Sequence, residues 1–344
     1  MDLQTLVKTT DYVSQFKQHK VIYRNYKDLN LMIVKRKYGS DYSEDIPWLN
    51  ECRGAIIDTS GTGDATHRVV FLPPSKSKEL STLSQFQQEC SRYTELVDGT
   101  MINLFYHNGK WLKATRSNIG CNNQWSSDLN FKQMFDDCSE TLDLQSLNQD
   151  NTYSFVMRHK KQRYTSPVDT NELVLVEMRN SSLERIPCET NEGYRVLQEV
   201  TTLKPLFKGY TAIKEGVRYK WLSNEHKFIQ MIEPNTNNPC LNYLTLRNSG
   251  HLVSYLQLFP EKRYEFDIYR TKVQQLTQML YEWYRGVFVQ KQLDKTDIPF
   301  AIRPFLYEIH KIYLQQKQGI AFSRVKQYVY DLEPKRIQFC LNHL

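Results

Sequence analysis

Polar residues that could bind a phosphate-bearing ligand stand at the ends of predicted β-strands. Asp98-Gly99 opens one strand, Thr115-Arg116 ends its partner, and Arg53-Gly54 lies on an earlier strand. Glu215-Gly216 opens a later strand that ends near Lys220. Carboxylates in such places can hold ribose hydroxyls or Mg²⁺, while Arg and Lys neutralise phosphate oxygens. Each dipeptide alone is more often only a turn, so the specific feature is their order along the chain.

The elements that would position these residues are β-hairpins. Residues 100–107 and 110–115 alternate in polarity around Asn108-Gly109, a dipeptide suited to the positive φ angles of a tight turn. Residues 52–58 (CRGAIID) and 68–72 (RVVFL) predict a second hairpin around a Gly-rich loop.

Further strands and one helix are predicted along the first part of the chain. One or two strands are expected within 1–50, and longer ones at 151–159 and 172–180. Shorter alternating pieces follow at 215–222 and 226–233, one helix is predicted at 130–138, and residues 193–204 have helical spacing. The pattern predicts an α+β domain with antiparallel strands at about 1–245.

The last part of the chain has a different character. Apolar residues recur at helical spacing from Ile268 to Val287, and two more helical patterns follow at 303–316 and 322–332. From residue 251 onward there are 14 Lys and Arg against 9 Asp and Glu. We therefore expect a small, basic, all-helical domain at about 246–344, which could bind nucleic acid or a protein partner.

Composition narrows the function classes. The 344 residues are 40% apolar with a formal charge of +7, which favours an anionic partner only weakly. Seven cysteines without a CxxC pair indicate free thiols, and no apolar segment has the length of a membrane span. We therefore expect a cytoplasmic or nuclear protein or, if it is viral, one found in the host cytoplasm or the virion. GxGxxG, GxxxxGK[ST], HExxH and GxSxG are all absent, which argues against the corresponding dinucleotide-binding, NTPase, zinc-protease and hydrolase classes.

Taken in order, the strand-end residues resemble a known family. The succession RG (53–54), PPSKSKEL (73–80), VDGTMINLF (97–105), WLKATRSNIG (111–120), YSFVMRHKKQRY (153–164), EGVRYK (215–220) and KFIQ (227–230) is similar to the covalent nucleotidyltransferase domain of RNA ligases. The likeness is to the phage T4 RNA ligase 1-like branch, and more closely to RNA-ligase-like proteins of large DNA viruses. It covers about residues 45–235.

The resemblance implies ATP and Mg²⁺ as cofactors and RNA or another nucleic acid as partner. In such ligases the lysine of a KxDG motif attacks the α-phosphate of ATP, and the resulting AMP passes to an RNA 5′-phosphate. Asp98, Glu215 and Lys227 would then be catalytic, with Glu215 linked to the metal. The implied nucleotide-binding positions are Leu96, Gly99, Arg116, Phe155, Gly216 and Lys220, the last a rival of Lys227 for the phosphate.

This chain departs from the family pattern at three positions. Leu96 stands where the nucleophilic lysine would be, and its side chain cannot form a phosphoramidate. Val156 replaces a common glutamate, and Ile229 replaces the second lysine of the final motif. A stand-in lysine could come from Lys76, Lys78, Lys110 or Lys113, although a solvated hairpin face is the default interpretation of Lys110 and Lys113.

A dense basic run offers a nucleic-acid contact. Arg158, Lys160, Lys161 and Arg163 could bind the phosphate backbone, as could Arg53, or the run could be a solvated loop between strands. Two functions of different class follow. One is an RNA ligase-type enzyme of degenerate activity that binds nucleotide and RNA ends. The other is an inactive pseudo-ligase that serves as a nucleic-acid- or protein-binding module.

Overall fold

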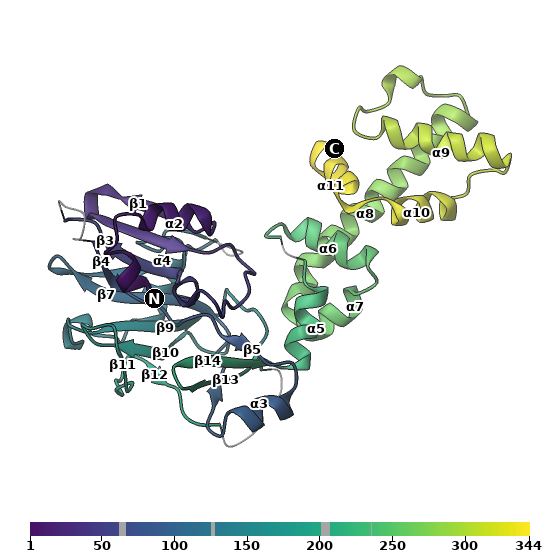
Figure 1. The fold of residues 1–344 in the computed structure, drawn as a ribbon. Helices are drawn as coiled ribbons and strands as arrows, with labels where there is room; N and C mark the ends of the chain where they lie inside the picture. Colours follow the sequence, from purple (N-terminus) through teal and green to yellow (C-terminus); the bar gives the residue numbers. More distant parts are fainter. Residues whose placement is uncertain (62–66, 125–127, 201–206, 235) are drawn as a thin grey trace. The chain divides into compact units, whose positions relative to one another are not determined.

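The computed structural model describes residues 1–61, 67–124, 128–200, 207–234 and 236–344, and the chain divides into two units (Figure 1). Met1–Lys227 is a mixed unit built on antiparallel sheets, and Phe228–Leu344 is helical. This agrees with the predicted α+β class followed by a helical region. No described helix is long and apolar enough to cross a membrane.

The first sheet has the order β1-β2-β3-β4, with antiparallel neighbours. Because successive side chains of a strand point to opposite faces, this sheet has two apolar faces. Met32 and Ile57 pack under the N-terminal helices, whereas Ile33 and Ile56 face Phe105 of the second sheet. The elements are α1 (Leu3–Leu6), α2 (Tyr12–Gln18), β1 (Ile22–Tyr26), the 3₁₀ turns Lys27–Leu29 and Pro47–Asn50, β2 (Leu31–Lys35), β3 (Arg53–Asp58) and β4 (Arg68–Phe71).

The second sheet has the order β11-β10-β9-β7-β8, and β12 pairs in parallel with β10. Helix α4 (Phe131–Cys138) begins at a capping box between Asn130 and Gln133 and packs its apolar face on the sheet. The predicted Asn108-Gly109 turn is confirmed, with φ of 48° and 79°. The strands are β7 (Thr100–His107), β8 (Lys110–Ala114), β9 (Thr152–Arg158), β10 (Glu172–Arg179), β11 (Arg185–Ile186) and β12 (Arg195–Val196), and a 3₁₀ turn spans Leu144–Ser146.

A third sheet has the order β5-β14-β13-β6, and helix α3 (Leu83–Glu89) packs against it. It joins β5 (Lys78–Glu79) and β6 (Thr94–Glu95) to the hairpin of β13 (Gly209–Lys214) and β14 (Val217–Leu222). Glu215 and Gly216, with φ of 50° and 80°, are the two turn residues of that hairpin. Positive φ at both positions is the geometry of a tight type I′ turn.

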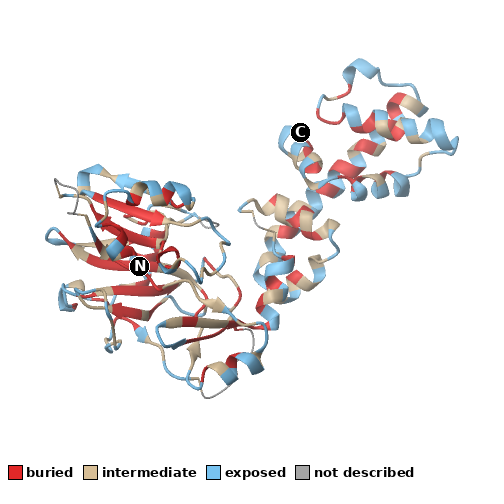
Figure 2. Ribbon diagram, viewed as in Figure 1, coloured by how far each residue is buried: buried red, intermediate tan, exposed pale blue. Residues whose placement is uncertain are grey.

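The helical unit surrounds its own core, and buried residues follow one side of its helices (Figure 2). Its elements are α5 (Asn224–Ile232), which spans the boundary between the units, α6 (Pro239–Asn248), α7 (Leu252–Leu258), α8 (Arg263–Tyr284), α9 (Arg303–Gln316), α10 (Phe322–Asp331) and α11 (Pro334–His343). The segment Arg285–Val289 continues α8 as a π-helix, and 3₁₀ turns span Pro260–Lys262 and Lys295–Asp297.

Three local predictions differ from the structure. Residues 226–233 lie mostly in α5 and not in a strand, because Ile229 and Ile232 face the helical core. The helix expected at 193–204 is absent from 193–200, where β12 and isolated bridges pair instead, and 201–204 lie outside the described residues. The units divide after Lys227 and not at 245, because α5 and α6 contribute to the helical core.

Candidate functional site

Asp98 is a buried anchor that joins three segments of the N-terminal unit. Its Oδ2 accepts hydrogen bonds from the backbone N–H groups of Thr165 and Ser166, at 2.6 and 3.0 Å. The Lys208 ammonium lies 3.6 Å from Oδ1, and only 5% of Asp98 is exposed. A buried carboxylate needs such partners. The residue predicted as catalytic is therefore held by two backbone donors at Oδ2, and its Oδ1 faces the charge of Lys208 without a hydrogen bond.

Gly99 lets strand β7 approach strand β9. A Cβ atom at this position would lie 2.4 Å from the carbonyl oxygen of Met157 and 2.7 Å from Cγ1 of Val156. No side chain fits between the strands here. The Asp98-Gly99 pair thus has a structural explanation: the aspartate holds the loop at 165–166, and the glycine allows the neighbouring strand to pair.

Lys208-Gly209 lies beside the Leu96 position, although no motif in the sequence marked it. The Leu96 N–H donates to the Gly209 carbonyl oxygen at 2.8 Å. Gly209 has φ of 151°, and a Cβ there would lie 1.9 Å from the carbonyl oxygen of Trp221. The available signal was a charged residue and a glycine opening an alternating strand, the same pattern as Asp98-Gly99.

Four half-buried cations gather on neighbouring loops and strands, and we call Lys35, Arg53, Lys76 and Arg116 the cation cluster. Lys35 and Arg53 are register partners on β2 and β3. The Arg116 guanidinium donates to the Arg36 carbonyl oxygen at 2.7 Å. Within the described part of the chain, no side chain of the cation cluster makes an ion pair with a carboxylate.

Burial and the mutual repulsion of its positive charges lower pKa values within the cation cluster. Burial, then Arg116 and Arg218, lowers the pKa of Arg53 to about 10. Burial also lowers the pKa of Lys76, with contributions from Arg53, Lys220 and Arg116 that Asp41 partly opposes. Burial and Arg116 lower the pKa of Lys35. An anion placed here would relieve both the desolvation and the repulsion.

A cavity of about 330 Å³ lies next to the cation cluster. Two of the carboxylates on its wall are already paired, Glu44 with Lys78 and Glu79 with Lys220, each at 2.7 Å. Lys76 makes no such pair with a described residue. The lining residues are Asp41, Tyr42, Glu44, Lys76, Ser77, Lys78, Glu79 and Lys220.

Gly54 brings Arg53 and Arg116 together, and its substitution gives a testable prediction. A Cβ at Gly54 (φ 106°) would lie 2.8 Å from the Cα of Arg116. We expect Gly54→Ala to lower the free energy of unfolding by about 3 kcal/mol, because backbone strain and a backbone clash add. Gly109→Ala is the matched control: φ is 79° but the space is open, so the cost is about 1 kcal/mol. Equal losses in urea unfolding would contradict this packing.

His226 extends the network around Asp98. Its Nδ1 lies 2.5 Å from Oγ1 of Thr165, and its backbone N–H donates to Oγ of Ser223 at 3.1 Å. Burial, then Lys208, lowers the pKa of His226 to about 4, against a weaker opposite effect of Asp98. The imidazole is therefore neutral near pH 7, and the Thr165 hydroxyl can donate to Nδ1.

The lowered pKa of His226 predicts acid sensitivity. The unfolded chain takes up the proton near pH 6.5 and the folded chain only near pH 4, so this contribution is complete above pH 6.5 and falls toward pH 4. The loss is about 3 kcal/mol of unfolding free energy. His226→Asn keeps an acceptor for Thr165 but does not titrate. Denaturant unfolding at pH 7 and 4.5 should show a steeper loss in the wild type, and parallel losses would contradict the assignment.

Several residues predicted for the site lie elsewhere or have other partners. Glu215 is exposed in the hairpin turn. The Phe155 ring is fully buried between Tyr153 and Tyr194, so it cannot pack on a nucleotide base. The Lys227 ammonium donates to the Ser81 carbonyl oxygen at 3.3 Å, whereas the rival Lys220 lies on the cavity wall with Lys76.

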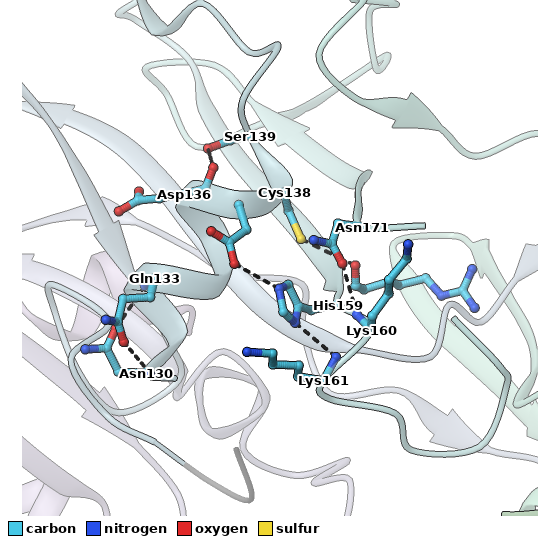
Figure 3. Close-up of polar contacts among 11 residues, drawn as sticks. Asn130, Gln133, Asp136, Cys138, Ser139, His159, Lys160, Lys161 and Asn171 are labelled. Atoms are coloured by element: carbon cyan, nitrogen blue, oxygen red, sulfur yellow. Dashed lines mark hydrogen bonds and ion pairs between the residues drawn. The ribbon is translucent and has the colours of Figure 1, made fainter. Parts of the chain in front are cut away.

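The basic residues at the end of β9 and after it differ in their contacts: the side chains of the two arginines have partners, whereas the two lysines are exposed. Arg158 pairs with Glu172 at 2.7 Å, and Arg163 donates to the Thr165 carbonyl oxygen at 3.2 Å. Lys160 and Lys161 are exposed in a turn held by their backbone N–H groups, which donate to Asn171 and His159 (Figure 3). Among the four basic residues of this run, Lys160 and Lys161 are the exposed ones, whereas Arg158 and Arg163 are half-buried.

The suggested stand-in lysines have different surroundings. Lys113 pairs with Asp136 and lies over the Phe135 ring, 4.5 Å from its centroid. Lys78 pairs with Glu44, and Lys110 is exposed beside the hairpin turn. Lys76 alone of the four belongs to the cation cluster.

A buried ionic group adjoins the site. Glu177 on β10 contacts Arg218, Arg179 at 2.7 Å and Arg185 at 3.1 Å. Burial by itself would raise the pKa of Glu177, but the three arginines outweigh it and hold that pKa below its usual value. Arg218 connects this group to Arg53, whose pKa it lowers. No sequence motif marked Glu177.

The donor set does not fit a magnesium site. Mg²⁺ requires oxygen ligands in near-octahedral geometry. Asp98, Glu79 and Glu44 each already face a lysine, and Glu177 faces three arginines. In the described ranges, no group of three or more His, Cys, Asp and Glu could hold a metal ion. The Mg²⁺ that the family resemblance implies thus has no evident place among these side chains.

Comparisons with known proteins give distant viral relatives, and no family model matches. The chain is 26% identical over 322 residues to an immediate-early protein ICP-46 homolog of Invertebrate iridescent virus 3, covering 84% of this chain and 72% of that protein. It is 28% identical over 122 residues to a protein of Autographa californica nuclear polyhedrosis virus named as a bifunctional polynucleotide kinase/RNA ligase. That match covers 33% of this chain and 17% of that protein.

A solved structure from Aquifex aeolicus, named as an ATP-dependent DNA ligase, is similar at a TM-score of 0.41 and 13% identity. The alignment covers 89% of this chain and 80% of that one.

Proposed function

We propose that this chain is a ligase-like protein that binds nucleotide phosphates and nucleic-acid ends and has lost self-adenylation at residue 96. The observation that carries the proposal is the cation cluster, whose half-buried Lys and Arg side chains have no carboxylate partner among the described residues. The matches to viral proteins, one of them named for an RNA ligase activity, support a ligase-like role.

A phosphate group suits the cation cluster better than a carboxylate or a neutral ligand. Arg53 and Arg116 can each present a planar fork of N–H donors, and Lys76 adds a point charge beside them. A triphosphate spreads several negative charges over many acceptor oxygens, so it can offset the repulsion among Arg53, Lys76 and Arg116 at once. A single carboxylate would leave most of that charge uncompensated.

The covalent step fails at Leu96 for a chemical reason. An aliphatic side chain has no lone pair to attack phosphorus, and the backbone of Leu96 is held by Gly209. The nearby Lys208 faces Asp98. What remains is a site that can bind the nucleotide and stabilise its charge without becoming covalently modified.

Two measurements test this proposal on the full chain. ATP binding is followed by titration calorimetry, and covalent transfer by α-labelled ATP with label sought on the denatured chain. We expect binding without label. A covalent adenylate that disappears in Lys76→Arg would overturn the loss of self-adenylation and establish a relocated nucleophile. Absence of binding would overturn the proposal itself.

A second experiment separates RNA contact from nucleotide contact. Lys160 and Lys161 are exposed, so the double change to Gln should weaken binding of a 5′-phosphorylated RNA and reduce its salt dependence. ATP affinity should not change, because neither side chain belongs to the cation cluster. RNA binding equal to the wild type would remove this turn from the nucleic-acid surface. Pre-adenylated RNA offered to the wild type then tests whether the later joining step survives.

A further inference from the structure

Three of the carboxylates around the candidate site, those of Asp98, Glu79 and Glu44, already face lysine side chains of the protein. Oδ2 of Asp98 accepts two backbone N–H groups and Oδ1 faces the Lys208 ammonium at 3.6 Å. Glu79 is paired with Lys220 and Glu44 with Lys78. Lysine side chains therefore contact the carboxylate oxygens that a divalent cation would need as ligands.

A magnesium ion bound by Asp98, Glu79 or Glu44 would have to displace a lysine, and it would add charge to a region with excess positive charge. The cation cluster contributes four Lys and Arg side chains, and Arg218 adds its charge to that of Arg53. Like charges that are close together in a half-buried site repel one another, because the protein screens them less than water does. The negative charge of a bound ligand would offset this repulsion.

We infer that the site binds its phosphate-bearing ligand as the metal-free polyanion, with Arg53, Lys76 and their neighbours supplying the counter-charge that magnesium supplies elsewhere. The inference rests on the proposed nucleotide binding and concerns the ionic form of the ligand. Magnesium halves the negative charge of ATP at neutral pH, so it removes part of the attraction that the cation cluster exerts.

Titration of the full chain with ATP tests the inference. Binding is measured by calorimetry in EDTA and in excess MgCl₂, with KCl adjusted so that ionic strength is equal. We expect the dissociation constant in EDTA to be about 3- to 10-fold lower than in MgCl₂. Binding in MgCl₂ that is lost in EDTA would overturn the inference and leave the proposed function standing. Absence of binding in both buffers would overturn the proposed function instead.

A substitution at Lys208 tests the same idea without nucleotide. Lys208→Glu would put a second carboxylate beside Asp98, where the lysine now provides the positive charge. We expect MgCl₂ to raise the melting temperature of Lys208→Glu and to leave the wild type unchanged. Lys208→Gln, which removes the charge without adding an oxygen pair, is the matched control. A wild-type melting temperature that rises with MgCl₂ would contradict the occupancy of these carboxylates by fixed cations.

Discussion

The double substitution Arg53→Gln with Lys76→Gln is expected to weaken ATP binding by at least ~100-fold. Each side chain can donate charge-assisted hydrogen bonds to phosphate, and each such bond contributes about 1.5–3 kcal/mol. Two of them correspond to about 3 kcal/mol or more, which is about two orders of magnitude in the dissociation constant. Calorimetric titration of the wild type and the variant provides the measurement.

The stability of the ligand-free variant distinguishes lost binding from lost folding. Arg53 and Lys76 repel each other, and burial opposes the charge of both. Removing the charges should therefore leave the melting temperature equal or higher. Lys78→Gln is the matched control, since Lys78 lines the same cavity but is paired with Glu44, and its ATP affinity should change little. Reduced stability together with reduced binding in the double variant would argue against a dedicated anion site.

The substitution Glu177→Gln is expected to destabilise the N-terminal unit by about 4 kcal/mol. Glu177 is 2% exposed and holds Arg179, Arg185 and Arg218. Removing one partner of a buried ion pair costs about 3–5 kcal/mol, because the opposite charge stays buried and uncompensated. Here three guanidinium groups would lose their counter-ion. The midpoint of guanidinium chloride unfolding measures the effect.

Glu172 provides the control for this prediction. It lies on the same strand and pairs with Arg158 and Arg195, but its side chain is 24% exposed, so water can solvate the arginines after substitution. We expect Glu172→Gln to cost about 1 kcal/mol or less. If Glu177→Gln cost no more than Glu172→Gln, the buried cluster would not be a stabilising element. A tighter ATP affinity in Glu177→Gln would further show that Arg218 and Arg53 share one electrostatic environment, because the uncompensated charge of Arg218 would add to the attraction for the phosphates.

Most of the strands and helices could be predicted because their signals are local. The β7–β8 hairpin follows from alternation around Asn108-Gly109, and α9 (Arg303–Gln316) coincides with the predicted helical pattern. The cysteines are free thiols, as their spacing indicated. Two of the three differences arose where tertiary packing overrode a weak pattern. The 226–233 segment became helical because Ile229 and Ile232 face a helical core, and β12 formed because β10 offered an edge in parallel register.

The candidate site was less predictable, because several of its residues depend on contacts between distant segments. Arg53 and Arg116 are 63 positions apart in sequence and become neighbours because Gly54 has no side chain. Lys208 faces Asp98 only because β6 and β13 pair. Glu215 shares the Glu-Gly pattern of the resembling family, yet the structure places it in an exposed turn, where positive φ explains the dipeptide without any metal.

Residue types and their order were sufficient to predict the antiparallel strands and the helical region that follows them, because both depend on short-range periodicity. The proposed loss of a nucleophile at Leu96 likewise rests on the chemistry of one side chain. Only the tertiary structure decided which charges are paired. Asp98, Glu79 and Glu44 are neutralised by lysines, whereas Arg53 and Lys76 lack carboxylate partners among the described residues. Burial and pairing set the energy of a charge, and both come from segments that are distant in sequence.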